Sequence, residues 1–100
     1  MSTSYLAFDL GASSGRAIVG TLNSGRMEMA EVHRFETRIV EEDGHLYWDI
    51  DGLWREMEYG LQEALRVAPN LRSLSVDSWA VDYVPIDTDG KALRNAFCYR

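Results

Sequence analysis

A short run of small and polar residues carries the first chemistry that the sequence suggests. The run extends from Asp9 to Arg16 and contains one carboxylate, two glycines, two serine hydroxyls and one guanidinium. Glycines let backbone amides approach an anion closely, because no Cβ stands in the way. Serine hydroxyls donate to phosphate oxygens, and an arginine neutralises their charge through paired hydrogen bonds. The run therefore favours binding of a nucleotide phosphate.

Asp9, at the start of this run, is a candidate metal contact. Magnesium keeps most of its waters, so a single carboxylate can hold the ion through water. The spacing differs from a Walker A loop, which needs Gly-Lys-Ser or Gly-Lys-Thr, and from the Gly-x-Gly-x-x-Gly fingerprint. A structural alternative stays open, since glycine and serine are ordinary hairpin residues and a strand-end aspartate often caps a turn.

A second cluster, from Ser75 to Tyr83, combines two carboxylates with two large aromatic rings at the end of a predicted central strand. Clefts in α/β sheets open at such strand ends. If this strand lies beside the first one, Asp77 comes close to Asp9. The two rings would then wall a small polyol, and Asp82 would accept its hydroxyl hydrogens.

The same cluster also has a purely structural interpretation. Trp79, Val81 and Tyr83 alternate along the chain, as the residues on one face of a strand do. Large aromatic rings of this kind are commonly core residues, and Asp82 would then face solvent.

Three predicted strands position the first cluster. Tyr5 to Asp9 is a nearly continuous apolar run ended by Gly11, which is typical of a strand buried on both faces. Arg16 to Leu22 and Met27 to Phe35 are the next two strands, joined by the turn Asn23 to Gly25. In the third strand the apolar positions change phase, which indicates a β-bulge. The short polar turns predict an antiparallel meander.

One amphipathic helix follows the acidic turn Glu41 to Gly44 and the aromatic stretch Leu46 to Trp48. Asp49 or Asp51 can cap its start, and Pro69 stops its end. Apolar residues recur at spacings of three and four, and we expect this stripe to be core. The stripe consists of Ile50, Leu53, Trp54, Met57, Leu61, Ala64, Leu65 and Ala68.

After the helix, Leu71 to Asp77 predicts a strand that returns beside the first strand in parallel, because a crossover helix precedes it. Val81 to Asp87, the turn Thr88 to Gly90, and Leu93 to Tyr99 predict a hairpin. The predicted fold class is α/β. The order β-β-β-α-β is that of the ribonuclease-H-like core, which actin-like ATPases, sugar kinases and several nucleases share.

Composition limits the chain to one packed core, since it has 100 residues, 26% of them charged, and a net charge of -6. The acidic balance disfavours nucleic-acid binding through a basic face. Cys98 is the single cysteine, the start lacks the pattern of a secretion signal, and no apolar run approaches the roughly 18 residues of a membrane span. We therefore expect a cytoplasmic protein with neither a nucleic-acid nor a membrane partner.

Four blocks, taken in order, resemble the amino-terminal segment of the FGGY family of carbohydrate kinases, and most nearly its L-rhamnulose-phosphorylating branch. The blocks are Asp9 to Arg16, His33 to Phe35, Asp43 to Asp51, and Val76 to Asp82 with Cys98 to Arg100. The resemblance implies ATP-dependent phosphorylation of a sugar hydroxyl, with Mg²⁺, in a cleft between two actin-like domains. Residues 1–100 would form the incomplete first domain.

The resemblance also implies roles for single residues. Asp9 resembles the family's magnesium-organising aspartate, which acts through water. The residues that resemble the family's phosphate loop for ATP are Gly11, Ala12, Ser13, Ser14, Gly15 and Arg16. The residues that resemble its sugar pocket are Asp77, Trp79, Ala80, Asp82, Tyr99 and Arg100. The family's catalytic aspartate and adenine site lie beyond Arg100, so we expect no catalytic base within the chain and no activity of these 100 residues alone.

One position departs from the family pattern. The branch typically has Thr-Trp-Gly-Val-Asp where this chain has Ser78-Trp-Ala-Val-Asp82. Ala80 therefore places a methyl group where the family has bare backbone that touches the sugar. The sugar is left open among L-rhamnulose and related ketoses or deoxy sugars.

Two other functions are weighed against the kinase. In ribonuclease-H-like nucleases, carboxylates on the first and fourth strands bind two metals, and Asp9 and Asp77 occupy such positions. The net negative charge, and the turn after Asp9 whose residues suit phosphate binding, count against a nuclease. The second alternative is a non-catalytic scaffold module. We also expect the 100 residues to self-associate, since an incomplete domain exposes apolar surface and strand edges.

Overall fold

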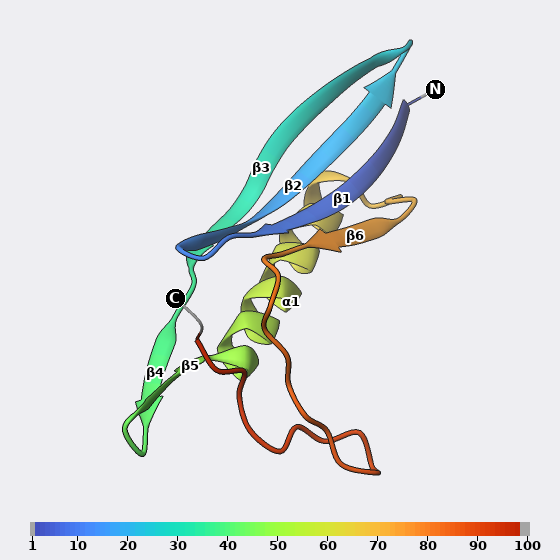
Figure 1. The fold of residues 1–100 in the computed structure, drawn as a ribbon. Helices are drawn as coiled ribbons and strands as arrows, with labels where there is room; N and C mark the ends of the chain where they lie inside the picture. The colour runs from blue at the N-terminus through green and yellow to red at the C-terminus, as the bar shows by residue number, and fades with distance from the viewer. Residues whose placement is uncertain (1, 99–100) are drawn as a thin grey trace.

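The structure is a computed structural model that describes residues 2–98. Tyr99 and Arg100, predicted to bind the sugar, lie outside the described residues. These described residues form six strands and one helix in an elongated molecule (Figure 1). The elements are β1 (Ser2–Leu10), β2 (Ser14–Asn23), β3 (Arg26–Glu36), β4 (Ile39–Glu42), β5 (His45–Trp48), α1 (Ile50–Val67) and β6 (Leu74–Asp77).

The main sheet has the order β3-β2-β1-β6. β1 and β2 pair antiparallel, and so do β2 and β3, which confirms the predicted meander. β6 pairs with β1 in parallel, from Leu6 opposite Leu74 to Asp9 opposite Asp77. The crossover helix thus returns the chain to the first strand as predicted, and it brings the carboxyl ends of two parallel strands to one edge of the sheet.

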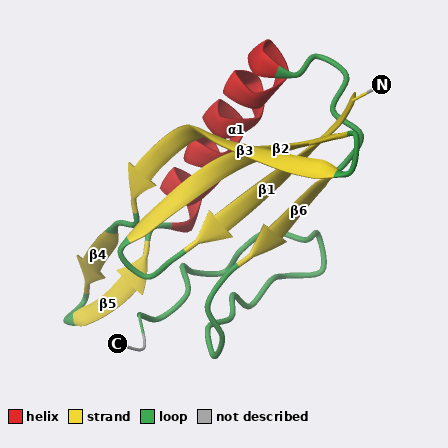
Figure 2. Cartoon of the chain, turned by 90° about the horizontal axis from the view of Figure 1, so that it is seen from above, coloured by secondary structure: helices red, strands yellow, loops and turns green. Residues whose placement is uncertain are grey.

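Helix α1 covers one face of this sheet, as Figure 2 shows. Leu6, Phe8 and Leu10 of β1 point to the helix and are buried, whereas Ala7 between them is exposed. The prediction of a strand buried on both faces is therefore wrong, because the described residues place a helix on only one side. Burial of a side chain such as Leu6 contributes roughly 2–3 kcal/mol.

The helix begins after Asp49, whose side chain accepts a hydrogen bond of 3.1 Å from the backbone N–H of Gly52. This confirms Asp49 as the N-cap. Close packing on the sheet depends on Gly60, where a Cβ would lie 2.9 Å from the Cβ of Ala17. Trp54 is exposed although it was predicted to belong to the core stripe. Leu65, another residue of the predicted core stripe, is exposed as well.

The predicted β-bulge in β3 is confirmed. Ala17 pairs with His33 and Ile18 pairs with Glu31, so that Val32 is the extra residue. On this outer strand Arg34 donates hydrogen bonds to Glu31, and this contact raises the pKa of Arg34 above its ordinary value. β3 has no further strand beside it in the described sheet.

The hairpin of β4 and β5 was not predicted, since Glu41 to Gly44 was interpreted as an acidic turn. Glu41 and Glu42 belong to β4, and only Asp43 and Gly44 form the turn, both with positive φ, 50° and 79°. Such a two-residue turn joins antiparallel strands tightly. The hairpin projects from the main sheet, as Figure 1 shows.

The segment after β6 contains less regular structure than predicted. The expected hairpin reduces to one antiparallel bridge between Ile86 and Ala92. The second arm instead approaches β5, with a bridge between Tyr47 and Phe97 and stacked rings 4.9 Å apart. Pairing with β5 was not foreseeable, since β5 itself was not predicted.

Candidate functional site

The two acidic strand ends lie side by side. Asp9 in β1 and Asp77 in β6 are register partners across the parallel pair. They come from positions 68 residues apart, and the crossover through α1 brings them together. Both carboxylates therefore stand at the edge of the sheet where α/β folds bind ligands, as the sequence predicted.

Asp9 is already paired with the arginine of its own loop. The Arg16 guanidinium donates from Nη2 to Oδ2 of Asp9 over 2.6 Å, and the two residues are also register partners in the antiparallel pair of β1 and β2. The residues predicted to hold metal and phosphate are thus linked to each other. Both side chains stay partly exposed, so a ligand can reach them.

The predicted phosphate loop is a tight turn fastened to the end of β3. The N–H of Gly11 donates to the carbonyl of Ser14 over 2.9 Å, which closes the turn. Thr37 holds it from outside: its N–H donates to the carbonyl of Ser13 over 3.0 Å, and its hydroxyl donates to the carbonyl of Gly11 over 2.8 Å. The loop is therefore preorganised before any ligand binds.

Both glycines of the loop have a packing reason as well. A Cβ at Gly11 would lie 2.9 Å from the Ser14 carbonyl oxygen. A Cβ at Gly15 would lie 2.2 Å from Cζ of the buried Phe35 ring. These glycines are required by the fold whether or not phosphate binds, so they are weaker evidence for a ligand than the sequence indicated.

The loop nevertheless presents its small side chains outward. Ala12 and Ser13 are exposed, and Ser14 is half-buried. Exposed serine hydroxyls beside a guanidinium suit a phosphate group. The loop thus offers a polar surface at the same sheet edge as the two aspartates.

A water-held magnesium ion fits the Asp9 carboxylate. Its side chain is 47% exposed, and the hydrogen bond from Arg16 reaches only one of its two oxygens. Within residues 2–98 no group of three or more His, Cys, Asp or Glu side chains forms a metal cluster. A single carboxylate with waters matches magnesium better than a metal that needs an all-protein cage.

The second cluster is only partly core. Trp79 is half-buried and packs against Trp48 of β5, with ring centroids 4.7 Å apart and planes tilted by 50°. Val81 and Tyr83, by contrast, are 69% and 68% exposed. The interpretation of three alternating core residues is therefore wrong for two of them, because the segment after β6 leaves the sheet instead of extending it as a strand.

Two buried polar atoms near this segment lack hydrogen-bond partners. They are the only such side-chain atoms in the part of the chain that the structure describes, and they are Oδ2 of Asp82 and Nε1 of Trp48. Asp82 is half-buried, so the expectation of a solvated carboxylate in the core interpretation does not hold. A buried oxygen without a donor is costly, which makes Asp82 a stronger ligand candidate than its sequence context alone.

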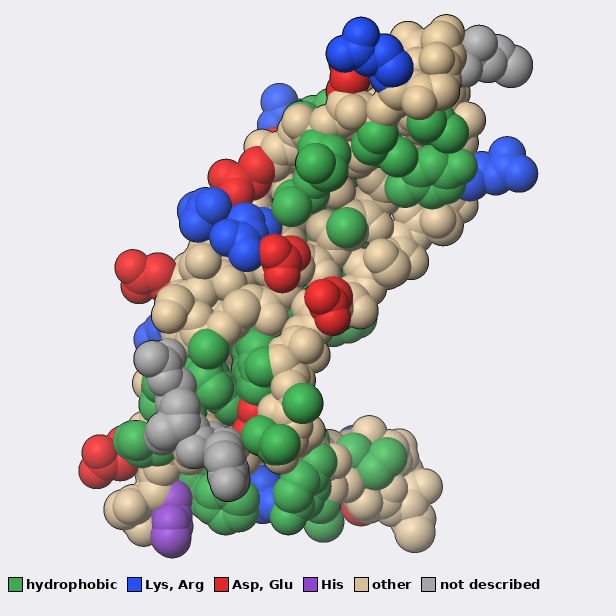
Figure 3. Space-filling view, turned by 45° about the horizontal axis from the view of Figure 1, so that its top comes forward, with side chains coloured by type: hydrophobic (Ala, Val, Ile, Leu, Met, Phe, Trp, Pro, Cys, Tyr) green, Lys and Arg blue, Asp and Glu red, His purple; other side chains and the backbone are tan. Residues whose placement is uncertain are grey.

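The two other predicted pocket residues that the structure describes lie on the surface. Asp77 and Ala80 are both exposed, and the hydroxyl of Ser78 donates to the carbonyl of Trp79 over 3.3 Å. The methyl group of Ala80 is thus accessible to a ligand. Figure 3 shows apolar side chains gathered on the same end of the molecule, around the hairpin and the segment after β6.

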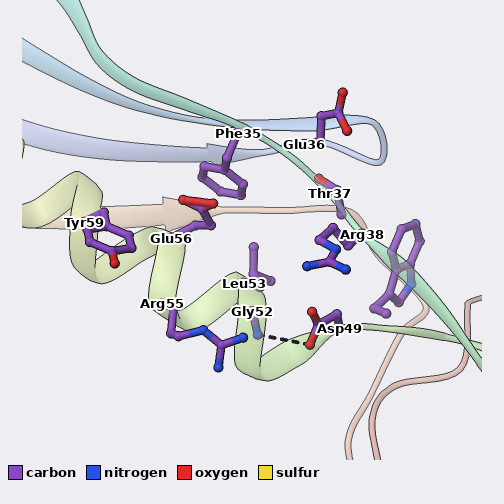
Figure 4. A pocket seen from close by; sticks show the side chains of 11 residues that line it. Phe35, Glu36, Thr37, Arg38, Asp49, Gly52, Leu53, Arg55, Glu56 and Tyr59 are labelled. Atoms are coloured by element: carbon purple, nitrogen blue, oxygen red, sulfur yellow. Dashed lines mark hydrogen bonds between the residues drawn. The ribbon is translucent and has the colours of Figure 1, made fainter.

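A hollow of about 120 Å³ lies elsewhere, between the end of β3 and the first turns of α1. Figure 4 shows Phe35 and Arg38 above the first turn of the helix, with the Asp49 carboxylate turned toward Gly52. None of the predicted site residues within the described range 2–98 lines it. The hollow therefore does not coincide with the site at the strand ends.

Sequence reasoning missed two residues that shape the site. Thr37 anchors the loop across 26 positions, and no local signal marks it. Trp48 supports Trp79, and its only signal was an unusually aromatic stretch before the helix. Neither contact was visible before β5 and the end of β3 were placed.

Comparison with known proteins aligns the chain with rhamnulokinases. It is 45% identical over 96 residues to the rhamnulokinase of Bacillus subtilis and 38% identical over 100 residues to that of Bacteroides thetaiotaomicron. The alignments cover 96% and 100% of this chain, which spans only about a fifth of the length of these relatives, 20% and 21%. No model of a protein family matches the sequence.

Solved structures show the same fold at low sequence identity. A gluconate kinase from Lactobacillus acidophilus matches with a TM-score of 0.79 and 13% identity, over 97% of this chain and 20% of that one. A xylulose kinase from Rhodospirillum rubrum matches with a TM-score of 0.71 and 20% identity, over 94% and 20%.

The meander, the crossover helix and the parallel return strand form the α/β fold that this chain shares with these two sugar kinases. The sequence similarity is more specific. The chain is similar to rhamnulokinases along its whole length, although it spans only about a fifth of theirs. The helix among the described residues is neither long nor apolar enough to cross a bilayer.

Proposed function

We propose that residues 1–100 are the amino-terminal part of the first domain of a longer kinase that transfers phosphate from ATP to a sugar hydroxyl. The observation that carries this proposal is the shared sheet edge of Asp9 and Asp77, next to a polar turn. The similarity to rhamnulokinases supports it. A single free cysteine, Cys98, agrees with a cytoplasmic site of action.

In this proposal the loop and Asp9 form the nucleotide half of the site. Asp9 would hold Mg²⁺ through water, and the loop with Arg16 would receive phosphate oxygens of ATP. When bound, the metal would neutralise charge on the transferring phosphate. Thr37 keeps the loop in place, and the pairing with Asp9 aims the Arg16 guanidinium at the sheet edge.

The segment after β6 forms the sugar half. Asp82 would accept hydrogen bonds from sugar hydroxyls, Trp79 would wall the sugar, and the Ala80 methyl group would narrow the space beside it. Asp77 stands between this half and the nucleotide half. The names of the relatives support L-rhamnulose as substrate, and a related ketose or deoxy sugar is the second choice because of Ala80.

No described residue is proposed as the catalytic base. In phosphoryl transfer the base only accepts the hydroxyl proton, while positioning and charge neutralisation supply most of the catalysis. The aspartates at the sheet edge are assigned to the metal and to the sugar. We therefore place the base, and the adenine site, in the remainder of the longer protein.

The nuclease alternative would use the same two aspartates. Their register fits a two-metal arrangement, but Arg16 occupies one oxygen of Asp9. The similarity to sugar kinases favours the kinase over a nuclease. A metal-dependent nuclease assay of the longer protein should stay blank.

The test is sugar-dependent ADP release by the complete protein with magnesium and ATP. The panel contains L-rhamnulose, L-fuculose, L-ribulose and D-xylulose. We expect release with at least one sugar, and the preferred sugar reports whether Ala80 has altered the pocket. A folded protein that binds ATP but releases no ADP with any sugar would contradict the proposal.

A further inference from the structure

The backbone at Val81 adopts a conformation that is unusual for its residue type. Its φ angle is 71°, in the left-handed region. Within residues 2–98 the other non-glycine residues with positive φ are Ser24 and Asp43, and each precedes a glycine in a tight turn between strands. Val81 is β-branched and stands in no such turn. A left-handed conformation is a genuine outlier for such a residue.

Packing of the valine side chain does not explain this conformation. The side chain is 69% exposed, so little apolar burial offsets the backbone strain. Strained residues of this kind persist where the surroundings enforce them, and they cluster at ligand sites. The strain is therefore explained by the neighbouring group that the backbone at Val81 positions.

The group that this backbone positions is the side chain of the next residue, Asp82. Oδ2 of Asp82 is buried and has no hydrogen-bond donor in the described part of the chain. An exposed valine with strained backbone is thus followed directly by a carboxylate oxygen turned inward. Each feature is unfavourable by itself, since a buried acceptor without a donor loses its hydration. Because the strained backbone and the unpaired oxygen belong to adjacent residues, we interpret them as parts of one site.

The place of this pair in the fold agrees with a ligand site. Val81 follows the last residue of β6, Asp77, by four positions, and it follows Trp79 by two. Trp79 is fixed against Trp48, so the chain before Val81 is anchored. The left-handed backbone at Val81 then determines where the Asp82 carboxylate lies relative to Trp79.

We propose that Val81 is a positioning residue whose left-handed backbone holds the Asp82 carboxylate inward to accept hydrogen bonds from substrate hydroxyls. This inference rests on the proposed sugar kinase function. Val81 itself needs no contact with the sugar. Holding the acceptor in place before binding reduces the ordering that binding would otherwise require. The class of ligand that satisfies such an oxygen is a polyol, which brings hydroxyl donors without adding charge.

The test uses the complete kinase and the sugar it prefers. Val81→Pro excludes the left-handed conformation, because the proline ring fixes φ at about −65°. We expect the KM for sugar to rise about 5- to 20-fold, while kcat and the KM for ATP stay within twofold. Val81→Gly keeps access to the left-handed conformation without the strain, so its KM for sugar should stay near that of the wild type and its melting temperature should stay the same or rise. The matched control is Val81→Thr, which is also β-branched and should behave like the wild type.

A double-mutant cycle separates positioning from a general structural effect. In an Asp82→Asn background, Val81→Pro should change the KM for sugar by less than twofold, because the group that the backbone at Val81 positions has already been altered. Val81→Asn is a second variant, since asparagine tolerates left-handed backbone, and its KM should stay near that of the wild type.

The outcomes separate this inference from the function on which it rests. A complete protein without sugar-dependent ADP release contradicts the proposed function, and the role of Val81 with it. An active kinase in which Val81→Pro leaves the KM for sugar unchanged overturns the inference alone. Equal effects of Val81→Pro with and without Asp82→Asn would also overturn it, because the residue would then act by another route.

Discussion

The two halves of the candidate site differ in how far their polar groups are satisfied. In the nucleotide half, Asp9 and Arg16 pair at 2.6 Å and Thr37 fastens the loop by two hydrogen bonds. In the sugar half, Asp82 has a buried oxygen without a donor and Val81 carries backbone strain. The first half is complete in the absence of a ligand, and the second is not.

This difference indicates which ligand each half would suit. A preorganised loop of fixed geometry suits phosphate, whose oxygens and charge are the same in every reaction cycle. An unsatisfied acceptor suits selection among sugars, because a ligand that lacks the right hydroxyl leaves a buried group unpaired. Under the proposed function, the nucleotide half would govern turnover, and the sugar half would govern the choice of substrate.

The largest expected effect comes from the nucleotide half. Asp9→Asn in the complete kinase should lower kcat about 100- to 1000-fold, because the carboxylate is proposed to organise the metal and it pairs with Arg16. ADP release at saturating ATP and sugar measures it. The control is Asp89→Asn, which alters an exposed residue of the turn near Ile86. If Asp9→Asn kept more than half of the activity, the scaffold alternative would be favoured.

The next effect concerns the stability of the loop. Gly15→Ala should lower the free energy of unfolding by about 2–3 kcal/mol, since its Cβ would lie 2.2 Å from the Phe35 ring. Gly20→Ala on the same strand is the matched comparison. Its Cβ would meet only the flexible Met27 side chain, whose sulfur is the nearest atom at 3.0 Å. Urea denaturation should show a clearly smaller loss there, and equal losses would refute the packing explanation of Gly15.

A third effect concerns the 100-residue chain in isolation. Leu74 and Val76 of β6 are each 50% exposed beside an unpaired strand edge, so we expect self-association in sedimentation velocity. Replacing both residues with threonine should weaken the association about tenfold, or about 1.4 kcal/mol. A monomeric wild-type chain at high concentration would show that these surfaces do not drive association.

The smallest effect concerns the stability of the sugar half. Asp82→Asn should raise the free energy of unfolding by about 1 kcal/mol in the absence of sugar, because a buried carboxyl oxygen without a donor is replaced by an amide group. Thermal unfolding at neutral pH measures the change. Addition of the preferred sugar should reverse the order of the two melting temperatures. A variant less stable than the wild type without sugar would mean that Asp82 has a partner in the complete protein.

Local patterns explain why the nucleotide half was predictable from sequence. The loop connects consecutive strands, so its turn, the pairing of β1 with β2 and the cap at Asp49 all follow from neighbouring residues. The bulge in β3 was visible as a change of apolar phase. The adjacency of Asp9 and Asp77 followed from the handedness and direction of a crossover connection.

The sugar half depends on contacts that no local pattern specifies. The segment after β6 rests on β5 through Trp48 and Phe97, and β5 lies in a hairpin that was interpreted as a turn. Alternation of Trp79, Val81 and Tyr83 suggested a strand, but the left-handed backbone at Val81 breaks that alternation. A strained conformation of a β-branched residue runs against its propensity, and propensity was the available guide.

Two-substrate kinetics of the complete kinase test most directly whether the nucleotide half affects turnover and the sugar half affects sugar binding. Sugar and ATP are varied independently for the wild type, Asp9→Asn and Asp82→Asn. The account predicts that Asp9→Asn lowers kcat with the KM for sugar within twofold, whereas Asp82→Asn raises the KM for sugar about tenfold and leaves the KM for ATP unchanged. An Asp82→Asn enzyme with wild-type KM for every sugar, or one whose KM for ATP rises equally, would contradict it.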